Sequence, residues 1–192
     1  MTEPPYQRIA AALRLRALDV QSLWHDELFV WYAAQLGSFA DAVRVGAVED
    51  VHPPGYVALI FVWRRLFGDG EIALRMPSVL AGVASVGWIA RLGATWLSPR
   101  AGLVAAALTA GSWMPIYYSQ EGRPYALLFL GTLVLAERIT AFTGRWVQAV
   151  GIAVVAVLLG YLHYFGLLFV VCALSVWGGV AVVERRDRAA WA

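Results

Sequence analysis

Long apolar stretches separated by short polar segments dominate the second half of the chain. Residues 101–120 carry no charged side chain, and residues 76–99 carry only Arg91, which can extend to a membrane interface. A bilayer core takes about 20 apolar residues per helix, so each stretch predicts a membrane span. Residues 146–183 are uncharged and long enough for two spans with a break at 160–166. The predicted spans are at about 76–98, 101–118, 124–142, 146–162 and 165–183.

The apolar run at residues 53–63 is shorter, because Arg64 and Arg65 follow it at once. Runs of about 10–14 residues are more often interfacial than spanning, so we predict an interfacial helix at 53–67. If this segment does not cross, one face holds most arginines and is cytoplasmic by the positive-inside rule. Arg64 and Arg65 then lie on the opposite face, which counts against this topology. That face also collects Asp26, Glu27, Glu121, His25, His52 and His163.

Composition supports a membrane protein. Hydrophobic residues make up 60% of the 192 residues, above the ~45–50% typical of soluble domains, and a chain of this length cannot bury so much apolar surface in water. All 15 basic residues are arginine, and the net charge of +2 does not favour nucleic acid binding. The predicted fold class is an all-α, polytopic membrane bundle with about five spanning helices and the interfacial helix.

The two ends of the chain do not match a complete membrane domain. Residues 9–18 are apolar and helical in pattern, but Arg14 and Arg16 leave no room for a span. The N-terminus has no signal-peptide pattern, and the chain ends soon after a charged cluster at 184–188. We expect residues 1–192 to be a single, truncated membrane domain, with an acidic extracytoplasmic loop and juxtamembrane helices at 20–75.

Several polar residues beside the predicted spans are candidates for chemistry. Asp26 and Glu27 form an acidic pair, which is either a solvated loop or a general base with a supporting acid, since a partly desolvated carboxylate can deprotonate an acceptor. His52 precedes Pro53 and Pro54 at a helix start; it either caps that helix or faces a phosphate there.

The loop at 117–125 brings Glu121, Arg123 and Tyr125 to the membrane edge, where ionisable residues are functional candidates by default. A guanidinium can bind a lipid-linked phosphate through two hydrogen bonds. His163 is either a structural residue or part of the same site. Arg75 either pairs with Glu71 or faces the phosphate, and the pairing is favoured. No zinc-ligand spacing, phosphate-binding loop or nucleophile motif is present.

The order of these motifs resembles a known family. The motifs are Ser-Leu-Trp-His-Asp-Glu at 22–27, His-Pro-Pro-Gly-Tyr at 52–56, Leu-Phe-Gly-Asp-Gly-Glu at 66–71 leading into Ala-Leu-Arg-Met-Pro-Ser at 73–78, Tyr-Ser-Gln-Glu-Gly-Arg-Pro-Tyr-Ala at 118–126, and His-Tyr-Phe at 163–165. Together they resemble the N-terminal half of family 39-type glycosyltransferases of the GT-C membrane fold, whose relatives include protein O-mannosyltransferases and aminoarabinose transferases.

The resemblance implies an inverting transfer of a sugar from a polyprenyl-phosphate donor to an extracytoplasmic protein, lipid or glycan acceptor at the plasma (inner) membrane. It places the base at Asp26 with Glu27 in support. Some relatives carry the second-loop acid where this chain has Tyr125, whereas here the carboxylate is Glu121. His52, Arg123, Tyr125, His163 and Arg75 are the candidate residues for binding substrate and lipid phosphate. No cofactor is required, and a metal ion is optional. Members are normally longer, so this piece is expected to be inactive alone.

Two other functions fit a chain of this kind. A transporter or flippase fragment would use intramembrane polar residues as a substrate pathway, with charges in the middle of spans and an inverted repeat. In this sequence the charges lie mostly at the ends of spans, and no repeat is visible. A non-catalytic membrane subunit would need only packing surfaces.

Overall fold

The structure is a computed structural model that describes residues 4–190, which form ten α-helices and no strand. The helices are α1 (Pro5–Leu15), α2 (His25–Ala34), α3 (Phe39–Val48), α4 (Gly55–Phe67), α5 (Glu71–Trp96), α6 (Pro99–Gly111), α7 (Trp113–Ser119), α8 (Tyr125–Thr140), α9 (Trp146–Leu162) and α10 (Tyr164–Ala190). The all-α prediction is confirmed.

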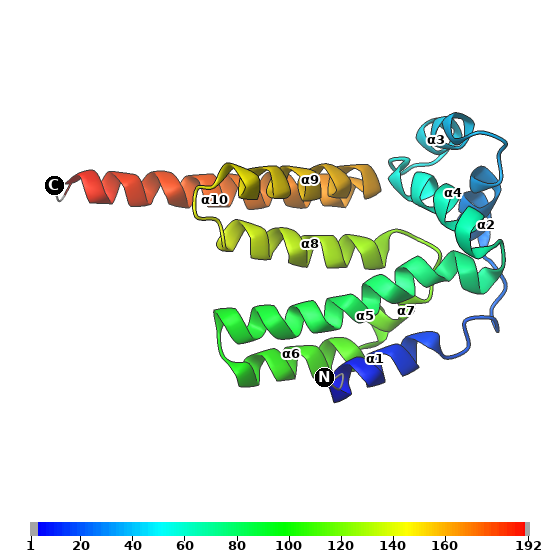
Figure 1. Cartoon of the computed structure of the whole chain (residues 1–192), viewed down its shortest axis with the longest axis horizontal. Helices are drawn as coiled ribbons and strands as arrows, with labels where there is room; N and C mark the ends of the chain where they lie inside the picture. The colour runs from blue at the N-terminus through cyan, green and yellow to red at the C-terminus, as the bar shows by residue number, and fades with distance from the viewer. Residues whose placement is uncertain (1–3, 191–192) are drawn as a thin grey trace.

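The long helices lie side by side and the short ones gather at one end. α5 packs against α6 and α8, and α9 packs against α8 and α10. Figure 1 shows these five helices running in nearly the same direction, with α2, α3 and α4 clustered beyond one end of them. The turn between α7 and α8 and the junction between α9 and α10 reach that same end. We call it the loop end, after these connections.

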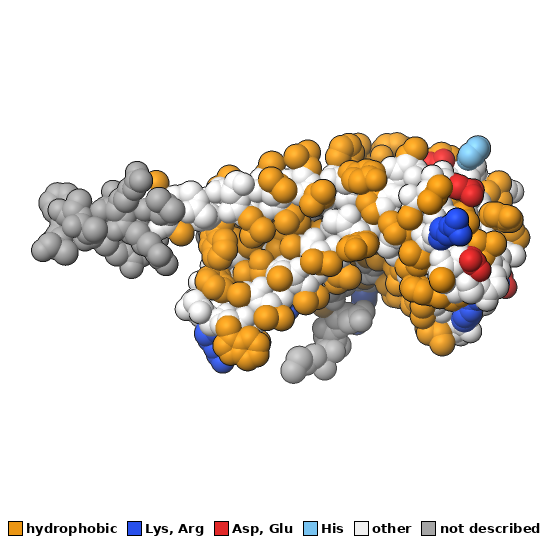
Figure 2. All heavy atoms as spheres, turned by 90° about the horizontal axis from the view of Figure 1, so that it is seen from above, with side chains coloured by type: hydrophobic (Ala, Val, Ile, Leu, Met, Phe, Trp, Pro, Cys, Tyr) orange, Lys and Arg blue, Asp and Glu red, His pale blue; other side chains and the backbone are white. Residues whose placement is uncertain are grey.

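Two helices are long and apolar enough to cross a membrane: α5, and residues Tyr164–Ala181 of α10. α9 is apolar but shorter, with 17 residues. On the outer faces of α9 and α10, branched aliphatic side chains such as Val154, Leu158, Leu168 and Val171 are more than half exposed, as a lipid-facing surface requires. Figure 2 shows hydrophobic side chains covering the length of the helices, with acidic and histidine side chains at the loop end.

The predicted span at 101–118 is two helices rather than one. α6 ends at Gly111, Ser112 is extended, with φ −73° and ψ 137°, and α7 begins at Trp113. Pro115 contributes to the break, because it has no N–H to donate to the carbonyl of Gly111. The predicted helix at 53–67 is α4, whose 13 residues measure about 20 Å, shorter than the ~30 Å of a bilayer core.

Arg14 closes the break between α6 and α7. Its side chain is completely buried, and the guanidinium donates to the carbonyl oxygens of Thr109 at 3.1 Å and Ala110 at 3.3 Å, and to the Ser119 hydroxyl at 3.2 Å. These carbonyls belong to the last turn of α6, where backbone acceptors lose their helical partners. A basic side chain at a helix C-terminus also complements the helix dipole. Arg14 therefore joins α1 to α6 and α7.

We expect Arg14→Ala to lower the free energy of unfolding by about 2–3 kcal/mol, because it leaves buried carbonyls without donors. Arg8→Ala, an exposed arginine on the same helix, is the matched control and should change stability by less than about 0.5 kcal/mol. Melting of the two variants in detergent compares them directly. Equal melting temperatures would show that Arg14 does not stabilise the packing of α1.

Candidate active site

The candidate site lies at the loop end, where α2, the start of α5, the turn at 120–124 and the α9–α10 junction come together (Figure 1). The predicted acids of two distant segments meet here. The backbone N–H of Gly122 donates to Glu27, and Arg123 donates to the backbone carbonyl of Asp26. The carboxylates near positions 26 and 121 are therefore at the same end of the helices, as the predicted topology requires.

Glu27 and Arg75 form a buried ion pair at the base of the site. Arg75 contributes two parallel hydrogen bonds, from Nε to Oε1 at 2.9 Å and from Nη2 to Oε2 at 2.7 Å. Glu27 also accepts from the N–H of Gly122 at 2.6 Å. The remaining guanidinium nitrogen of Arg75 donates to the carbonyl oxygens of Leu18 and Gln21. Arg75 pairs with Glu27, not with Glu71 as the sequence suggested, and each of its three guanidinium nitrogens bonds within the protein.

Asp26 is the open acid of the pair. Its side chain is 40% exposed, and its nearest charged neighbour is the exposed His25, with Nδ1 at 3.8 Å. α2 starts at His25, so consecutive side chains point in different directions around the helix. This geometry turns Glu27 into the protein and leaves Asp26 facing the surface. The two carboxylates have separate environments and cannot share one proton.

Arg123 is held in a network of polar groups. The side chain is 2% exposed, and its guanidinium lies 2.9 Å from His52 Nδ1 and 3.7 Å from an oxygen of Asp50. Asp50 in turn lies 3.0 Å from His52 Nδ1 and accepts from the His52 backbone N–H at 3.2 Å. The Nε of Arg123 is buried and has no hydrogen-bond partner among the described residues. Arg123 therefore keeps one unused donor.

His163 and Tyr125 complete this cluster. The His163 ring is 4.6 Å from that of His52 and 5.6 Å from that of Tyr125, between centroids. His163 Nδ1 accepts from the backbone N–H of Phe165 at 3.0 Å, so the neutral ring carries its proton on Nε2. Burial lowers the pKa of His163, and the nearby His52 and Arg123 lower it further. The ring is therefore a neutral donor.

Glu121 is buried beside the site, with 7% of its surface exposed. Burial raises its pKa, and the charges of Glu27 and Asp26 act in the same direction; the hydroxyl of Tyr117 and the charge of Arg123 oppose the shift without reversing it. Glu121 therefore holds its proton to higher pH than an ordinary glutamate.

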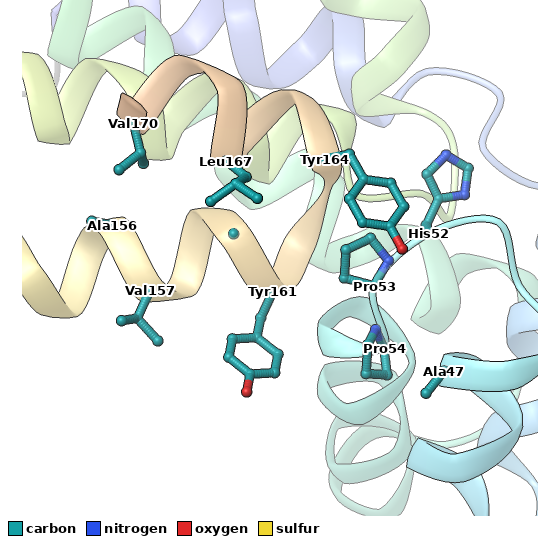
Figure 3. A pocket seen from close by; sticks show the side chains of 11 residues that line it. Ala47, His52, Pro53, Pro54, Ala156, Val157, Tyr161, Tyr164, Leu167 and Val170 are labelled. Carbon is teal, nitrogen blue, oxygen red and sulfur yellow. The ribbon is translucent and has the colours of Figure 1, made fainter. Parts of the chain in front are cut away.

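A groove leads away from the histidines along α9 and α10. Gly55 makes it possible, because a Cβ at this position would lie 2.4 Å from the carbonyl oxygen of Tyr161. The close approach seats the start of α4 against the end of α9. The resulting cavity of about 500 Å³ is lined by His52, Pro53, Pro54, Tyr161, Tyr164, Leu167 and other apolar side chains. Figure 3 shows His52 at one end of this groove and Val170 toward the other.

The structure thus brings all eight predicted site residues to the loop end. Glu27 and Arg75 form the buried pair. His52, Arg123, Tyr125 and His163 form a second cluster, of which His52 lines the groove. Asp26 and Glu121 lie on the neighbouring segments, α2 and the turn at 120–124. Sequence reasoning missed Asp50, although its position two residues before His52 is typical of a turn in which an aspartate accepts from a backbone N–H. Within residues 4–190, no group of three or more His, Cys, Asp or Glu side chains is placed to hold a metal ion.

An all-helical chain with exposed apolar helices and a polar cluster at their ends has the features expected of a membrane glycosyltransferase of the GT-C type. Residues 51–191 match the family described as dolichyl-phosphate-mannose-protein mannosyltransferase, and the chain belongs to this family. The resemblance inferred from the ordered motifs is confirmed. No curated protein and no solved structure matches the chain.

The buried ion pair gives a prediction about stability. Glu27→Gln keeps the shape of the side chain but leaves Arg75 without a counter-charge, and breaking a buried pair in this way costs about 3–5 kcal/mol. Glu49→Gln, at an exposed position, should melt like the wild type. The double variant Glu27→Gln with Arg75→Gln should lose less than the sum of the two single variants. Additive losses would mean that the two side chains do not interact.

The raised pKa of Glu121 predicts a pH dependence. Because the folded protein binds this proton more tightly than the unfolded chain, the contribution of Glu121 to stability is complete below its ordinary pKa and is lost as pH rises through the raised value. Glu121→Gln removes this loss. Between about pH 4 and pH 8, the melting temperature of the wild type should therefore fall relative to that of Glu121→Gln. A constant difference between the two proteins would contradict the raised pKa.

Proposed function

We propose that this protein catalyses inverting transfer of a sugar from a polyprenyl-phosphate donor to an extracytoplasmic acceptor hydroxyl or amide. The observation that carries the proposal is the position of Arg123, a buried guanidinium whose Nε has no partner among the described residues. It donates to the backbone carbonyl of Asp26 on one side and contacts His52, at the start of the apolar groove, on the other. This arrangement offers Arg123 for the donor phosphate, the groove for the polyprenyl chain and Asp26 for the acceptor.

The phosphate of the donor fits the side of the cluster formed by Arg123 and His52. Arg123 Nε lacks an acceptor in the protein, and a phosphate oxygen is the acceptor that a guanidinium binds most strongly. Asp50 forms an ion pair with Arg123 at 3.7 Å through Nη1, so a bound phosphate shares the guanidinium with this carboxylate. The Nε2–H of His163 is a further neutral donor near this position.

The polyprenyl chain fits the groove between the α3–α4 connection and helices α9 and α10. Its walls are prolines, alanine, leucine, valine and the rings of Tyr161 and Tyr164, and a surface of this kind binds a hydrocarbon chain in preference to a sugar. The polar end of the groove is His52. A lipid phosphate therefore has its charge at Arg123 and its chain along the surface of the bundle.

Asp26 is the acid best suited to act as the base. Glu27 already makes two hydrogen bonds to Arg75 and one to Gly122, and burial raises the pKa of Glu121, so that carboxyl holds its proton longer. Only the Asp26 carboxylate is open to the surface, with the exposed His25 as its one charged neighbour within 4 Å among the described residues. Glu27 supports it by fixing the start of α2.

The reaction is an in-line displacement at the anomeric carbon. The acceptor oxygen or nitrogen attacks this carbon while its proton passes to Asp26, and the bond between the anomeric carbon and the phosphate oxygen breaks. The electron pair leaves with the polyprenyl phosphate, whose negative charge is stabilised by Arg123 with His52. No nucleotide is involved. The configuration at the anomeric carbon inverts, because a single displacement occurs.

The same proposal includes a multi-pass arrangement in the plasma (inner) membrane, with the loop end extracytoplasmic. Arg91 and Arg138 lie toward the other ends of α5 and α8, as expected for the cytoplasmic side. The two arginines that counted against this topology interact locally at the loop end. Arg64 pairs with Asp69 at 2.5 Å, and Arg65 donates to the carbonyl oxygens of Phe61 and Leu36.

Replacement of Asp26 is the direct test. In a longer protein that contains residues 1–192, with polyprenyl-phosphate mannose carrying a labelled sugar as the probe, Asp26→Asn should lower transfer by about 10²–10⁴-fold, the usual contribution of a general base, without weakening donor binding. Arg123→Gln should weaken donor binding itself. Asp19→Asn, an exposed neighbouring aspartate, is the control and should behave as wild type. Transfer by Asp26→Asn at the wild-type rate would remove Asp26 from the mechanism, and failure of the wild type to bind the donor would reject the proposed function.

A further inference from the structure

A cavity lined by charged and polar side chains lies at the end of the bundle opposite the loop end. It has a volume of about 270 Å³ and is lined by Trp88 and Arg91 from α5, Glu137, Arg138 and Ala141 at the end of α8, and Gln148 from α9. Arg91 is 16 residues beyond Arg75 along α5, or about 24 Å at the rise of an α-helix. The cavity is therefore separate from the candidate active site and lies near the other membrane surface.

The charges around this cavity do not cancel. Arg91 and Glu137 neutralise each other through an ion pair with an N–O distance of 2.8 Å. Arg138 makes no ion pair with any residue whose side chain the structure describes, and its guanidinium lies across α9 at Gly151, where a Cβ would be 3.1 Å from Nη1. One positive charge therefore remains; the Arg138 side chain is exposed, and its guanidinium lies against α9 at Gly151.

Trp88 supplies a second indication of a ligand. Its indole Nε1 is buried and has no hydrogen-bond partner among the described residues. A buried donor left without an acceptor costs about 1–3 kcal/mol, so an acceptor oxygen supplied by a ligand would stabilise this nitrogen. The polar atoms of Gln148 do not meet the need, because they already bond to Thr143 and to the carbonyl of Ala141.

We propose that this cavity binds a phosphate group through Arg138 and Trp88. A phosphate offers several acceptor oxygens, so it can accept from the guanidinium of Arg138 and from the indole of Trp88 at once. Its negative charge balances the unpaired arginine, while the ion pair with Arg91 keeps Glu137 from repelling it. A basic cavity between membrane helices is a recurrent binding place for anionic lipid head groups, and free phosphate has the same chemistry.

Native mass spectrometry of the detergent-solubilised protein tests the proposal and separates the two sources. The probes are phosphatidylglycerol, phosphatidylcholine as the zwitterionic lipid of similar shape, and inorganic phosphate. Arg138→Gln should reduce binding of the phosphate probe about tenfold, as expected when a charge-assisted hydrogen bond is lost. Trp88→Phe should reduce it less, and Arg138→Lys should retain part of it. Arg100→Gln, an exposed arginine outside the cavity, is the matched control.

Preferential binding of phosphatidylglycerol that is lost in Arg138→Gln identifies a lipid head group as the ligand. Binding of inorganic phosphate with the same dependence identifies a soluble phosphate. The proposal is overturned if neither probe loses affinity in Arg138→Gln, or if Arg100→Gln loses as much. Trp88→Phe keeps an aromatic side chain but removes the indole N–H, so it serves as the independent variant should Arg138→Gln not fold.

Discussion

The ion pair between Glu27 and Arg75 organises the loop end of this protein. It connects three segments that are far apart in sequence, because Glu27 starts α2, Arg75 belongs to the first turns of α5, and Gly122 lies between α7 and α8. Two buried charges are expensive to desolvate, and here every oxygen and nitrogen of the pair has a partner, which is the condition under which such a pair is tolerated. The pair fixes these three segments, and with them the positions of Asp26 in α2 and of Arg123 in the turn between α7 and α8.

The three carboxylates of the site illustrate how environment divides roles among similar residues. Glu27 is fully bonded within the protein, Glu121 is buried with a raised pKa, and Asp26 is open to the surface. Chemically these are nearly the same group. The positions along α2 and along the turn at 120–124 determine which of them faces the surface, while Arg123 and the Nε2–H of His163 are hydrogen-bond donors in the neighbouring cluster.

The sequence predicted the parts of this structure that depend on local pattern. Uncharged stretches gave the long helices, and the two arginines after residue 63 gave the short α4. The ordered motifs gave the family; the eight site residues that they suggested stay a prediction. Pairings between distant residues were not accessible in this way. Arg75 has an acidic neighbour four residues earlier, yet it pairs with Glu27, 48 residues away. The break at Ser112 was missed because hydropathy does not register a lost backbone hydrogen bond, and Asp50 was missed because its role depends on the packing of Arg123 against it.

Arg14 has a consequence for how the protein assembles during synthesis. Its partners Thr109 and Ala110 are made 95 and 96 residues after it, when α5 and most of α6 have been synthesised. Before that, the acceptor in its own helix is the carbonyl oxygen of Ala10. A lone guanidinium does not enter hydrocarbon at low cost. The docking of α1 against α6 and α7 through Arg14 therefore depends on the completion of α6.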